Sequence, residues 1–299
     1  MTYHEPVMLK ECLDGLAVKS SGVYVDATFG GGGHSRGILS RLGADGRLVA
    51  FDQDADALQN KIDDPRFELL HENFMHMKSF LRLKGIKAVD GVLADLGVSS
   101  HQFDEGERGF STRYDGPLDL RMDRRQELTA ATLVNTMEKE ELTRLLRLYG
   151  ELPNAGAMAG AICAARGVQP IETTAQLKEA VRRHLPRGRE NKFLAMLFQA
   201  LRIEVNGELE ALRKMLQQAV ELLVPGGRLV VISYHSLEDR MVKHMMQCGN
   251  VEGVVEKDMY GNVLSDVRPV VRKAITASAE ETERNSRARS AKLRIGERV

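Results

Sequence analysis

Short apolar runs alternate with helical segments along the first hundred residues of the chain. The apolar runs that we predict to be strands are residues 23–26, 47–52, 67–70 and 88–95. Runs of this length, bounded by turns, are typical of strands that are buried on both faces of a sheet. A helix predicted at 34–42 connects the first two strands. The order strand, helix, strand indicates βαβ units and therefore an α/β fold with a mostly parallel sheet.

The middle of the chain has helical periodicity instead, with no strand pattern between about residues 102 and 223. Thr173 and Gln176 have the spacing of a capping box, and Gly150 is predicted to end an earlier helix as its C′ residue. Asn206 and Gly207 separate the last two helical segments. The alternative that one continuous helix runs through both residues stays open. The predicted helices are 138–148, 154–166, 173–185, 193–205 and 207–223.

Strand patterns return near the C-terminus. Residues 228–234 follow a Pro-Gly-Gly turn and predict a further strand of the sheet, and 267–275 and 290–295 predict antiparallel edge strands. The simplest organisation is a discontinuous α/β domain, residues 1–102 and 207–299, that carries an all-helical insert at 103–206.

Composition limits the class of protein. The chain has 299 residues, of which 43% are hydrophobic and 28% are charged, as in soluble globular proteins. The first residues lack a basic start followed by an apolar stretch, so we expect no signal peptide, and the apolar runs are too short to cross a bilayer. Cys12, Cys163 and Cys248 are scattered, which predicts a reducing cytosol, no disulfide framework and no metal site.

The formal net charge of zero argues against a nucleic-acid partner, but the charges are unevenly distributed. An insert cluster consists of Arg182, Arg183, Arg187, Arg189 and Lys192. A C-terminal cluster consists of Arg284, Arg287, Arg289, Lys292, Arg294 and Arg298. Each cluster by itself is typical of solvated surface, and the two together are compatible with a face that binds phosphates.

Four consecutive glycines, Gly30 to Gly33, follow the first predicted strand, which ends in Asp26. Glycines let the backbone approach a ligand, and the helix that follows presents unpaired N–H groups. Asp52 ends the second strand 22 positions after Gly30, about the spacing at which an acidic residue binds ribose hydroxyls. The pattern predicts a site for an adenosine with free hydroxyls.

The dinucleotide pattern Gly-x-Gly-x-x-Gly fails here, because Ser35 or Arg36 stands where the third glycine belongs. This favours S-adenosylmethionine over a nicotinamide dinucleotide. Two alternatives stay open. A titration of S-adenosylmethionine against NAD(P) distinguishes a nicotinamide oxidoreductase, and methyl transfer to RNA excludes a non-catalytic RNA-binding protein.

Candidate chemical groups follow the other strand ends. Asp95 ends the fourth strand, where its carboxylate can either grip the N–H of an exocyclic amine or only position the cofactor. Tyr234 and His235 are expected in the same cleft, and His34 is assigned to a cofactor or helix-start contact. Phe74 is suited to pack on adenine or to fill the core.

Two further patterns concern the later parts of the chain. Ser236 and Asp239 predict an N-cap with an acidic first turn. Between residues 102 and 125, aromatic residues alternate with arginines in a way that fits either base stacking with phosphate contact or an interdomain segment held by ion pairs. The residues in question are Phe103, Arg108, Phe110, Arg113, Tyr114, Arg121, Arg124 and Arg125.

Eight motifs distributed along the chain occur together in a fixed order, at residues 4–9, 26–35, 95–100, 107–111, 116–123, 198–203, 234–240 and 287–290. By these motifs the chain resembles the bacterial ribosomal RNA small-subunit methyltransferase H family from its first residues to its last. The resemblance implies a Rossmann-like class I methyltransferase fold with a helical insert. The implied activity is transfer of a methyl group from S-adenosylmethionine to the N4 amine of a decoding-region cytidine in 16S rRNA, in the cytoplasm.

The resemblance also assigns residues and partners. The implied substrate is 16S rRNA within the small ribosomal subunit or a late precursor, with no membrane partner, and a homodimer is left open. Asp95 is the candidate catalytic residue. One segment, 192–197, departs from the His-Pro-Ala-x-Arg pattern frequent in the family, which puts RNA contacts there in doubt. The implied cofactor contacts are Gly32, Gly33, His34, Asp52, Phe74, Asp95 and Gln102.

Overall fold

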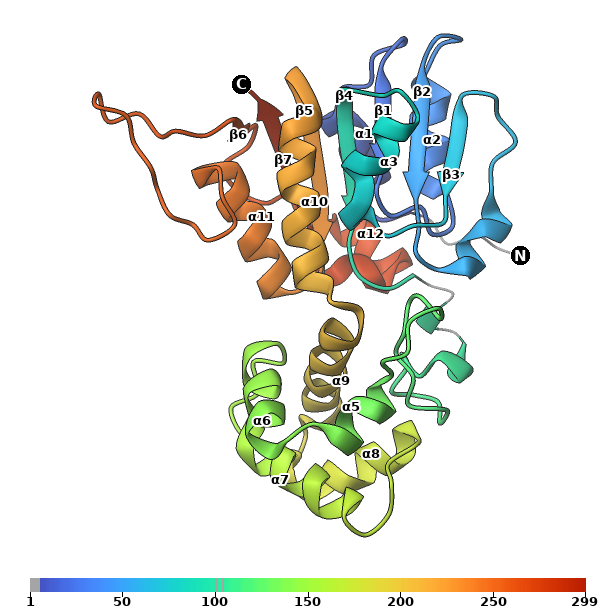
Figure 1. The fold of residues 1–299 in the computed structure, drawn as a ribbon, viewed down its shortest axis with the longest axis vertical. Helices are drawn as coiled ribbons and strands as arrows, with labels where there is room; N and C mark the ends of the chain where they lie inside the picture. The colour runs from blue at the N-terminus through green and yellow to red at the C-terminus, as the bar shows by residue number, and fades with distance from the viewer. Residues whose placement is uncertain (1–5, 100–101, 104) are drawn as a thin grey trace. The chain divides into compact units, whose positions relative to one another are not determined.

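The structure is a computed structural model that describes residues 6–99, 102–103 and 105–299. The chain divides into two compact units (Figure 1). The first unit comprises Met1–Gly97 and Leu209–Val299, and the second comprises Val98–Glu208. The unit boundaries lie at residues 98 and 208, where the sequence suggested 103 and 206. Among the described residues, no helix is long and apolar enough to span a membrane.

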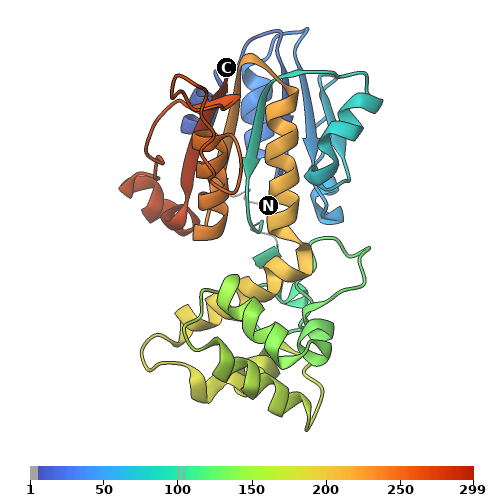
Figure 2. The same ribbon diagram turned by 60° about the vertical axis from the view of Figure 1, so that its left-hand side comes forward.

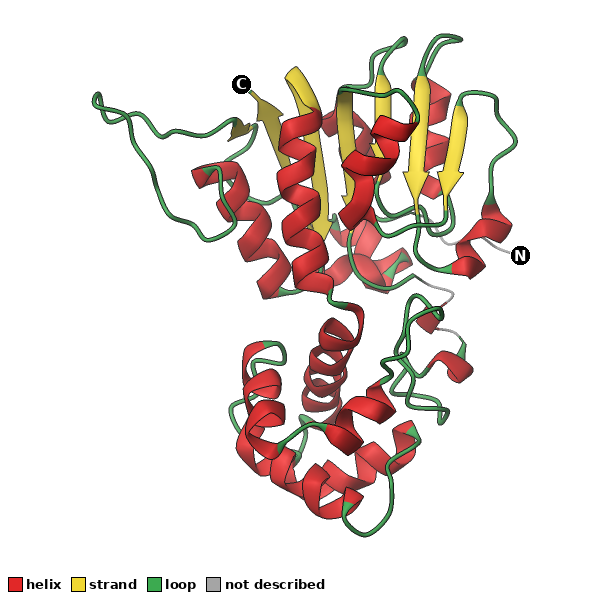
Figure 3. Ribbon diagram, in the orientation of Figure 1, coloured by secondary structure: helices red, strands yellow, loops and turns green. Residues whose placement is uncertain are grey.

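The first unit is built on a seven-stranded sheet in the order β3-β2-β1-β4-β5-β7-β6 (Figure 3). The first five strands in this order are parallel, and β7 is antiparallel to both β5 and β6. The α/β class with a mostly parallel sheet and antiparallel final strands is therefore confirmed. The strands are β1 (Val23–Asp26), β2 (Arg47–Phe51), β3 (Phe67–Leu70), β4 (Val89–Asp95), β5 (Leu223–Ser233), β6 (Val267–Pro269) and β7 (Lys292–Arg298).

The central strands are buried on both faces, which explains why they appear in the sequence as continuous apolar runs. Successive residues of a strand point to opposite faces. Tyr24 therefore packs in one core and Val25 in the other, and both are 0% exposed. Leu48 and Val49 on β2 divide in the same way.

Helices cover both faces of this sheet (Figures 1 and 2). One face carries α1 (Leu9–Leu16), α2 (Gly33–Arg41) and α12 (Ala279–Arg284). The other carries α3 (Met77–Leu83), α10 (Glu208–Leu222) and α11 (Ser236–Cys248). Short 3₁₀ turns occur at η1 (Ala55–Asn60), η2 (Phe74–His76) and η5 (Ser286–Ser290).

The second unit is helical and has a hydrophobic core of its own. Its helices are α5 (Ala130–Thr136), α6 (Lys139–Leu148), α7 (Ala155–Arg166), α8 (Thr174–Val181) and α9 (Glu190–Asn206), with 3₁₀ turns η3 (Gly106–Arg108) and η4 (Arg182–His184). The capping box of Thr173 and Gln176 is confirmed. Gly207 has a φ of 56° and separates α9 from α10, so the alternative of one continuous helix is wrong.

α6 ends at Leu148 with Tyr149 as its C-cap, so the predicted position of Gly150 as the C′ residue is confirmed, but Gly150 does not have a left-handed conformation. The left-handed position is occupied by Glu151, whose φ is 51°. A Cβ atom on Gly150 would lie 2.8 Å from the carbonyl oxygens of both Leu146 and Met196. The glycine is therefore needed because the backbone of α9 approaches the end of α6 closely at this point, and not because a left-handed conformation is required.

Candidate active site

The carboxyl ends of β1 and β4 meet at the centre of the sheet, although β2 and β3 lie between them in sequence. Strand order reverses at this point, and ligands of open α/β sheets bind beyond the carboxyl ends of strands at such a reversal. Asp26 and Asp95 are the last residues of the two strands. Two acids that the sequence singled out thus lie at the carboxyl ends of the central strands, where a ligand is expected.

Asp26 organises the glycine loop. Its side chain is fully buried and accepts hydrogen bonds from the Thr28 backbone N–H (3.1 Å) and the Ser35 hydroxyl (2.6 Å). The Thr28 hydroxyl in turn accepts the backbone N–H of Asp95 at 2.6 Å. Burial raises the pKa of Asp26, although the bond from Ser35 opposes this. Asp26 therefore fixes the shape of the site and has no free surface to offer a ligand.

Glycine is required at two positions of the loop. Gly32 has a φ of 75°, and a Cβ atom there would lie 2.9 Å from the Phe29 ring. A Cβ atom on Gly33 would lie 2.9 Å from the ring of Pro6. Gly32 precedes the first residue of α2, and no side chain caps this helix. The loop thus presents backbone alone at the N-terminus of α2, as the run of glycines predicted for a ligand-binding turn.

Asp52 follows β2 and reaches back to the glycine loop. One oxygen accepts the backbone N–H of Gly30 at 2.7 Å and the other accepts that of Asp54 at 2.9 Å. Burial raises the pKa of Asp52 to about 7, against the lowering effect of these two bonds. A carboxylate oxygen has two acceptor sites, so each oxygen retains capacity for one further hydrogen bond. The geometry suits a pair of ribose hydroxyls.

His34 is buried, and its two ring nitrogens have different partners. Nε2 lies 3.0 Å from the carbonyl oxygen of Val7. A carbonyl can only accept, so Nε2 carries the proton of this bond. Nδ1 faces the Oδ2 atom of Asp95 at 3.8 Å. His34 therefore connects the chain that precedes α1 to the end of β4, and its ring does not cap α2.

Asp95 is held from two sides. Its backbone is bound by Thr28, and its Oδ1 atom accepts the hydroxyl of Tyr234 at 2.7 Å. The side chain keeps an exposed fraction of 23%, so a ligand can reach it. Burial raises the pKa of Asp95, while His34 and the bond from Tyr234 lower it. At the carboxyl ends of the central strands, Asp95 is therefore an acid that is held in one orientation and is also accessible to a ligand.

The start of α11 differs from the prediction. The N-cap is His235, which forms a capping box with Glu238, so the prediction of Ser236 as the N-cap was wrong, whereas the predicted acidic first turn is confirmed by Glu238 and Asp239. Nε2 of His235 lies 3.1 Å from a Glu238 carboxylate oxygen, so the ring is engaged by its own helix. Glu238 also accepts the backbone N–H of Tyr234 at 2.9 Å. Asp239 instead pairs with β7, through Arg294 at 2.6 Å.

The remaining predicted contacts are more dispersed. Phe74 lies in η2 beyond β3 and packs, partly buried, against the core on the α3 face. Gln102 belongs to the second unit, is 4% exposed, and accepts the backbone N–H of Ser99 at 3.0 Å. The assignment of Phe74 and Gln102 to the cofactor stays a prediction. His4, Glu5 and Ser100, which belong to the family motifs, lie outside the described residues.

The arginines between residues 102 and 125 are mostly engaged within the second unit. Arg108 is 2% exposed and donates to the carbonyls of Arg121 and Met122. Arg121 pairs with Asp119 at 2.7 Å. For Arg108 and Arg121 the interpretation as a segment held by internal bonds is correct. Among the aromatic residues, Tyr114 remains 54% exposed.

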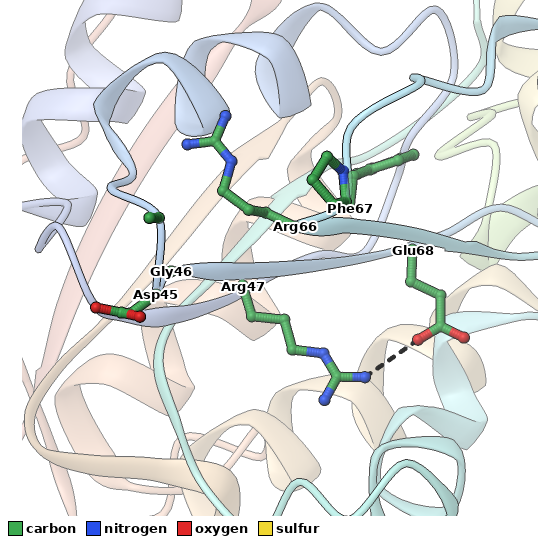
Figure 4. Close-up of a pocket in the computed structure, with 8 residues that line it drawn as sticks. Asp45, Gly46, Arg47, Arg66, Phe67 and Glu68 are labelled. Carbon is green, nitrogen blue, oxygen red and sulfur yellow. Dashed lines mark hydrogen bonds and ion pairs between the residues drawn. The ribbon is translucent and has the colours of Figure 1, made fainter.

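A surface pocket occurs at the amino ends of the strands, where β2 and β3 begin (Figure 4). Arg47, Arg66, Phe67 and Glu68 contribute to its lining, and Arg47 bonds to Glu68 at 3.2 Å. This pocket is separated from the acids described above by the length of the strands. It contains none of the residues that the sequence singled out.

Comparison with known proteins identifies the family. Residues 1–299 match the model of the MraW methylase family. The chain is 55% identical over 299 residues to the ribosomal RNA small subunit methyltransferase H of Christiangramia forsetii, covering 100% of this chain and 99% of that protein. It is 56% identical over 298 residues to the protein of the same name from Bacteroides thetaiotaomicron, covering 100% and 98%. An rRNA methylase structure from Streptococcus thermophilus aligns with a TM-score of 0.45 at 10% identity, covering 100% and 99%. The family relationship predicted from the sequence motifs is confirmed: the chain belongs to the MraW methylase family.

Proposed function

We propose that this methylase transfers a methyl group from S-adenosylmethionine to the exocyclic N4 amine of a cytidine in the decoding region of 16S ribosomal RNA. The observation that carries the proposal is the position of Asp95, a fixed and accessible carboxylate at the carboxyl end of β4. The names of the relatives, ribosomal RNA small subunit methyltransferase H, support the choice of RNA.

S-adenosylmethionine is the cofactor, and when bound it supplies an electrophilic methyl group. The glycine loop fits such a molecule, since Gly32 and Gly33 have no room for side chains and leave the backbone accessible. Asp52 retains an acceptor site on each oxygen for the ribose hydroxyls. His34, Phe74 and Gln102 are proposed as further contacts.

Asp95 suits an amine acceptor in particular. The N4 amine of cytosine is conjugated to its ring and is a weak nucleophile. A carboxylate that accepts its N–H localises the nitrogen lone pair and aids loss of a proton, which is the action of a general base. Such a base has to lie within hydrogen-bond reach of the amine. Asp95 is therefore proposed as the catalytic residue.

The helical insert, residues 103–206, is proposed as the domain that binds the RNA substrate. Its insert cluster (Arg182, Arg183, Arg187, Arg189 and Lys192) is exposed, as expected of side chains that contact phosphates. The substrate is 16S rRNA in the small ribosomal subunit or a late precursor, and the reaction then takes place in the bacterial cytoplasm.

The test is product analysis. The purified protein is incubated with S-adenosylmethionine carrying a labelled methyl group and with small subunits from a strain that lacks this gene. The rRNA is digested to nucleosides and analysed by mass spectrometry against N4-methylcytidine and 5-methylcytidine standards. We expect label in N4-methylcytidine from a single decoding-region fragment, and none with Asp95→Asn. Label in another nucleoside would contradict the N4 assignment, and no label in any RNA would contradict the choice of substrate.

A further inference from the structure

The two carboxylate oxygens of Asp95 have different surroundings. Oδ1 accepts the Tyr234 hydroxyl at 2.7 Å. Oδ2 faces Nδ1 of His34 at 3.8 Å, which is longer than a hydrogen bond. Within the described part of the chain, no hydrogen bond reaches Oδ2. Because the backbone N–H of Asp95 is also bound, the carboxylate has one occupied oxygen and one open oxygen in a fixed orientation.

Tyr234 owes its position to the start of α11. Its backbone N–H is bound by Glu238, which is 3% exposed and belongs to the capping box of that helix. The tyrosine hydroxyl is thereby directed at the end of β4, so that one side-chain bond joins the ends of two strands. Burial and the nearby Asp95 carboxylate raise the pKa of Tyr234 well above its usual value. The hydroxyl therefore remains a donor over the whole physiological range.

His34 is oriented by a bond on the far side of its ring. Since Nε2 donates to the Val7 carbonyl, Nδ1 is the nitrogen that faces Asp95. Val7 is itself positioned by the next residue. Met8 has a left-handed φ of 51°, and its N–H donates to the buried Glu281 carboxylate at 2.7 Å.

From this arrangement we propose that Oδ2 of Asp95 accepts the proton that the cytidine amine loses, and that Tyr234 and His34 are positioning residues that keep this oxygen ionised and open. The inference rests on the proposed function. Asp95 is the catalytic residue because it touches the reacting amine. Tyr234 and His34 act through Asp95.

Methyl transfer by this route conserves atoms and charge. The N4 lone pair forms a bond to the methyl carbon, and the carbon–sulfur bond breaks with its electron pair left on sulfur. The nitrogen, now positively charged, loses one proton to Oδ2. The products are the N4-methylated base, S-adenosylhomocysteine and a protonated Asp95. Water can then remove the proton, since the Asp95 side chain is 23% exposed.

The charged and titratable groups around Asp95 come from several elements. His34 on α2 and Tyr234 after β5 favour its ionised form, whereas burial, Asp26 on β1 and Glu238 on α11 oppose ionisation. Cys12 on α1 is also near, and its thiol stays protonated because burial and Asp95 raise its pKa. Tyr234 and His34 are thus the two groups whose removal should make Asp95 harder to ionise.

The experiment measures the ionisation of Asp95 directly and compares it with the rate. Asp95 is observed by NMR in protein labelled with ¹³C at the aspartate carboxyl carbon, its resonance being identified by its loss in Asp95→Asn. Tyr234→Phe keeps the ring and removes the donor. His34→Gln keeps a donor for Val7 and removes the nitrogen that faces Asp95. For each variant, the Asp95 midpoint should rise by about one pH unit. The acid limb of the single-turnover methylation rate, measured with S-adenosylmethionine at saturation, should move with it.

The matched control is Tyr24→Phe. This variant removes a buried hydroxyl that accepts the Lys19 N–H near the amino end of β1, away from Asp95. It should leave the Asp95 midpoint unchanged. An unmoved midpoint in Tyr234→Phe, or a rate loss equal at every pH, would overturn the inference. If the midpoint moves but the wild-type product is a different methylated base, the N4 assignment fails and the positioning roles stand.

Discussion

The chain carries two basic clusters that look alike in the sequence and differ in the structure. The insert cluster (Arg182 to Lys192) is exposed, and among the described residues no ion pair engages Arg183, Arg187, Arg189 or Lys192. In the C-terminal cluster, Lys292 and Arg294 share Asp239, and Arg298 pairs with Asp266. Formal charge is similar in the two clusters, but the charge available to a partner is not.

The cause of the difference is the surrounding secondary structure. Lys292, Arg294 and Arg298 belong to β7, which packs beside α11 and pairs with β6, so acids from distant parts of the sequence come within reach. The insert cluster lies around η4 and the start of α9, where Glu179 and Glu190 are the nearby acids in sequence. The insert cluster is therefore the better candidate for phosphate contact, and variants of each cluster can test that distinction.

A reference variant is needed that weakens the cofactor site and touches neither cluster. Asp52→Ala should cost about 1.5–3 kcal/mol of S-adenosylmethionine binding, because a charge-assisted hydrogen bond is removed. The wild-type affinity should rise as pH increases through about 7, where Asp52 ionises and becomes the better acceptor, and the variant should lack this rise. Calorimetry between pH 6 and 8 measures both. Equal affinities for wild type and variant would contradict the assignment of Asp52 to the ribose hydroxyls.

Neutralising the insert cluster should have the next largest effect. Replacing Arg183, Arg187, Arg189 and Lys192 by Ala is expected to weaken rRNA binding roughly 10- to 100-fold at low salt and to reduce the salt slope by about 0.7–0.9 for each phosphate that is no longer bound. S-adenosylmethionine affinity should not change. The control is Arg213→Ala with Lys214→Ala on α10, whose charges are already paired with Glu210. Wild-type binding and salt slope in the first variant would mean that the insert cluster is ordinary solvated surface.

A change in the C-terminal cluster should affect stability instead. Arg294→Met breaks a largely buried pair with Asp239 and should lower the free energy of unfolding by about 1–2 kcal/mol at neutral pH. Burial alone would raise the pKa of Asp239, but the bonds from Arg294 and Lys292 outweigh it and lower the pKa. The stabilisation is therefore present above the ordinary aspartate pKa and disappears as pH falls below it.

Urea denaturation at pH 7 and below pH 4 measures this effect, and the gap between wild type and Arg294→Met should close in acid. Arg289→Met is the matched control, since Arg289 is exposed and has no ion pair in the described structure. A fall in RNA affinity for Arg294→Met, at unchanged stability, would contradict the assignment of the C-terminal cluster to the fold.

The smallest effect is expected for Arg298→Gln. Its partner Asp266 is 73% exposed, and exposed pairs contribute about 0.5 kcal/mol or less. Both stability and RNA affinity should stay close to wild type. A large change in RNA affinity would show that the pair opens to bind phosphate, and the distinction between the two clusters would then fail.

Local patterns were enough to predict much of the first unit. The strands, the glycine loop and the positions of Asp52 and Asp95 follow from apolar runs and from residues next to them in sequence. The bond between Tyr234 and Asp95 joins residues 139 positions apart, and no local pattern contains it. The protonated nitrogen of His34 likewise depends on the carbonyl of Val7, a residue of the 4–9 motif to which no local pattern assigned a contact.

The errors have a common origin in tertiary contacts. Gly150 follows the end of α6 as predicted, but glycine is needed there because α9 approaches closely and not because the backbone is left-handed. Ser236 is a better N-cap by intrinsic preference than His235. Asp239 forms an ion pair with Arg294, however, and Glu238 completes the capping box with His235. Arg108 was a candidate for RNA contact and is buried in the second unit. In each case a distant residue outweighed the local preference.

The bond from Met8 to Glu281 has a consequence for the synthesis of the protein. These residues are 273 positions apart, and β7, which completes the same face, is later still. While the ribosome is still translating this messenger, α1 has neither its carboxylate partner nor the strand against which Gly15 packs. The contact between Val7 and His34 then lacks its support. The nascent chain is accordingly expected to complete this face of the sheet, and with it the support for the contact between Val7 and His34, only after Glu281 and β7 have been synthesised.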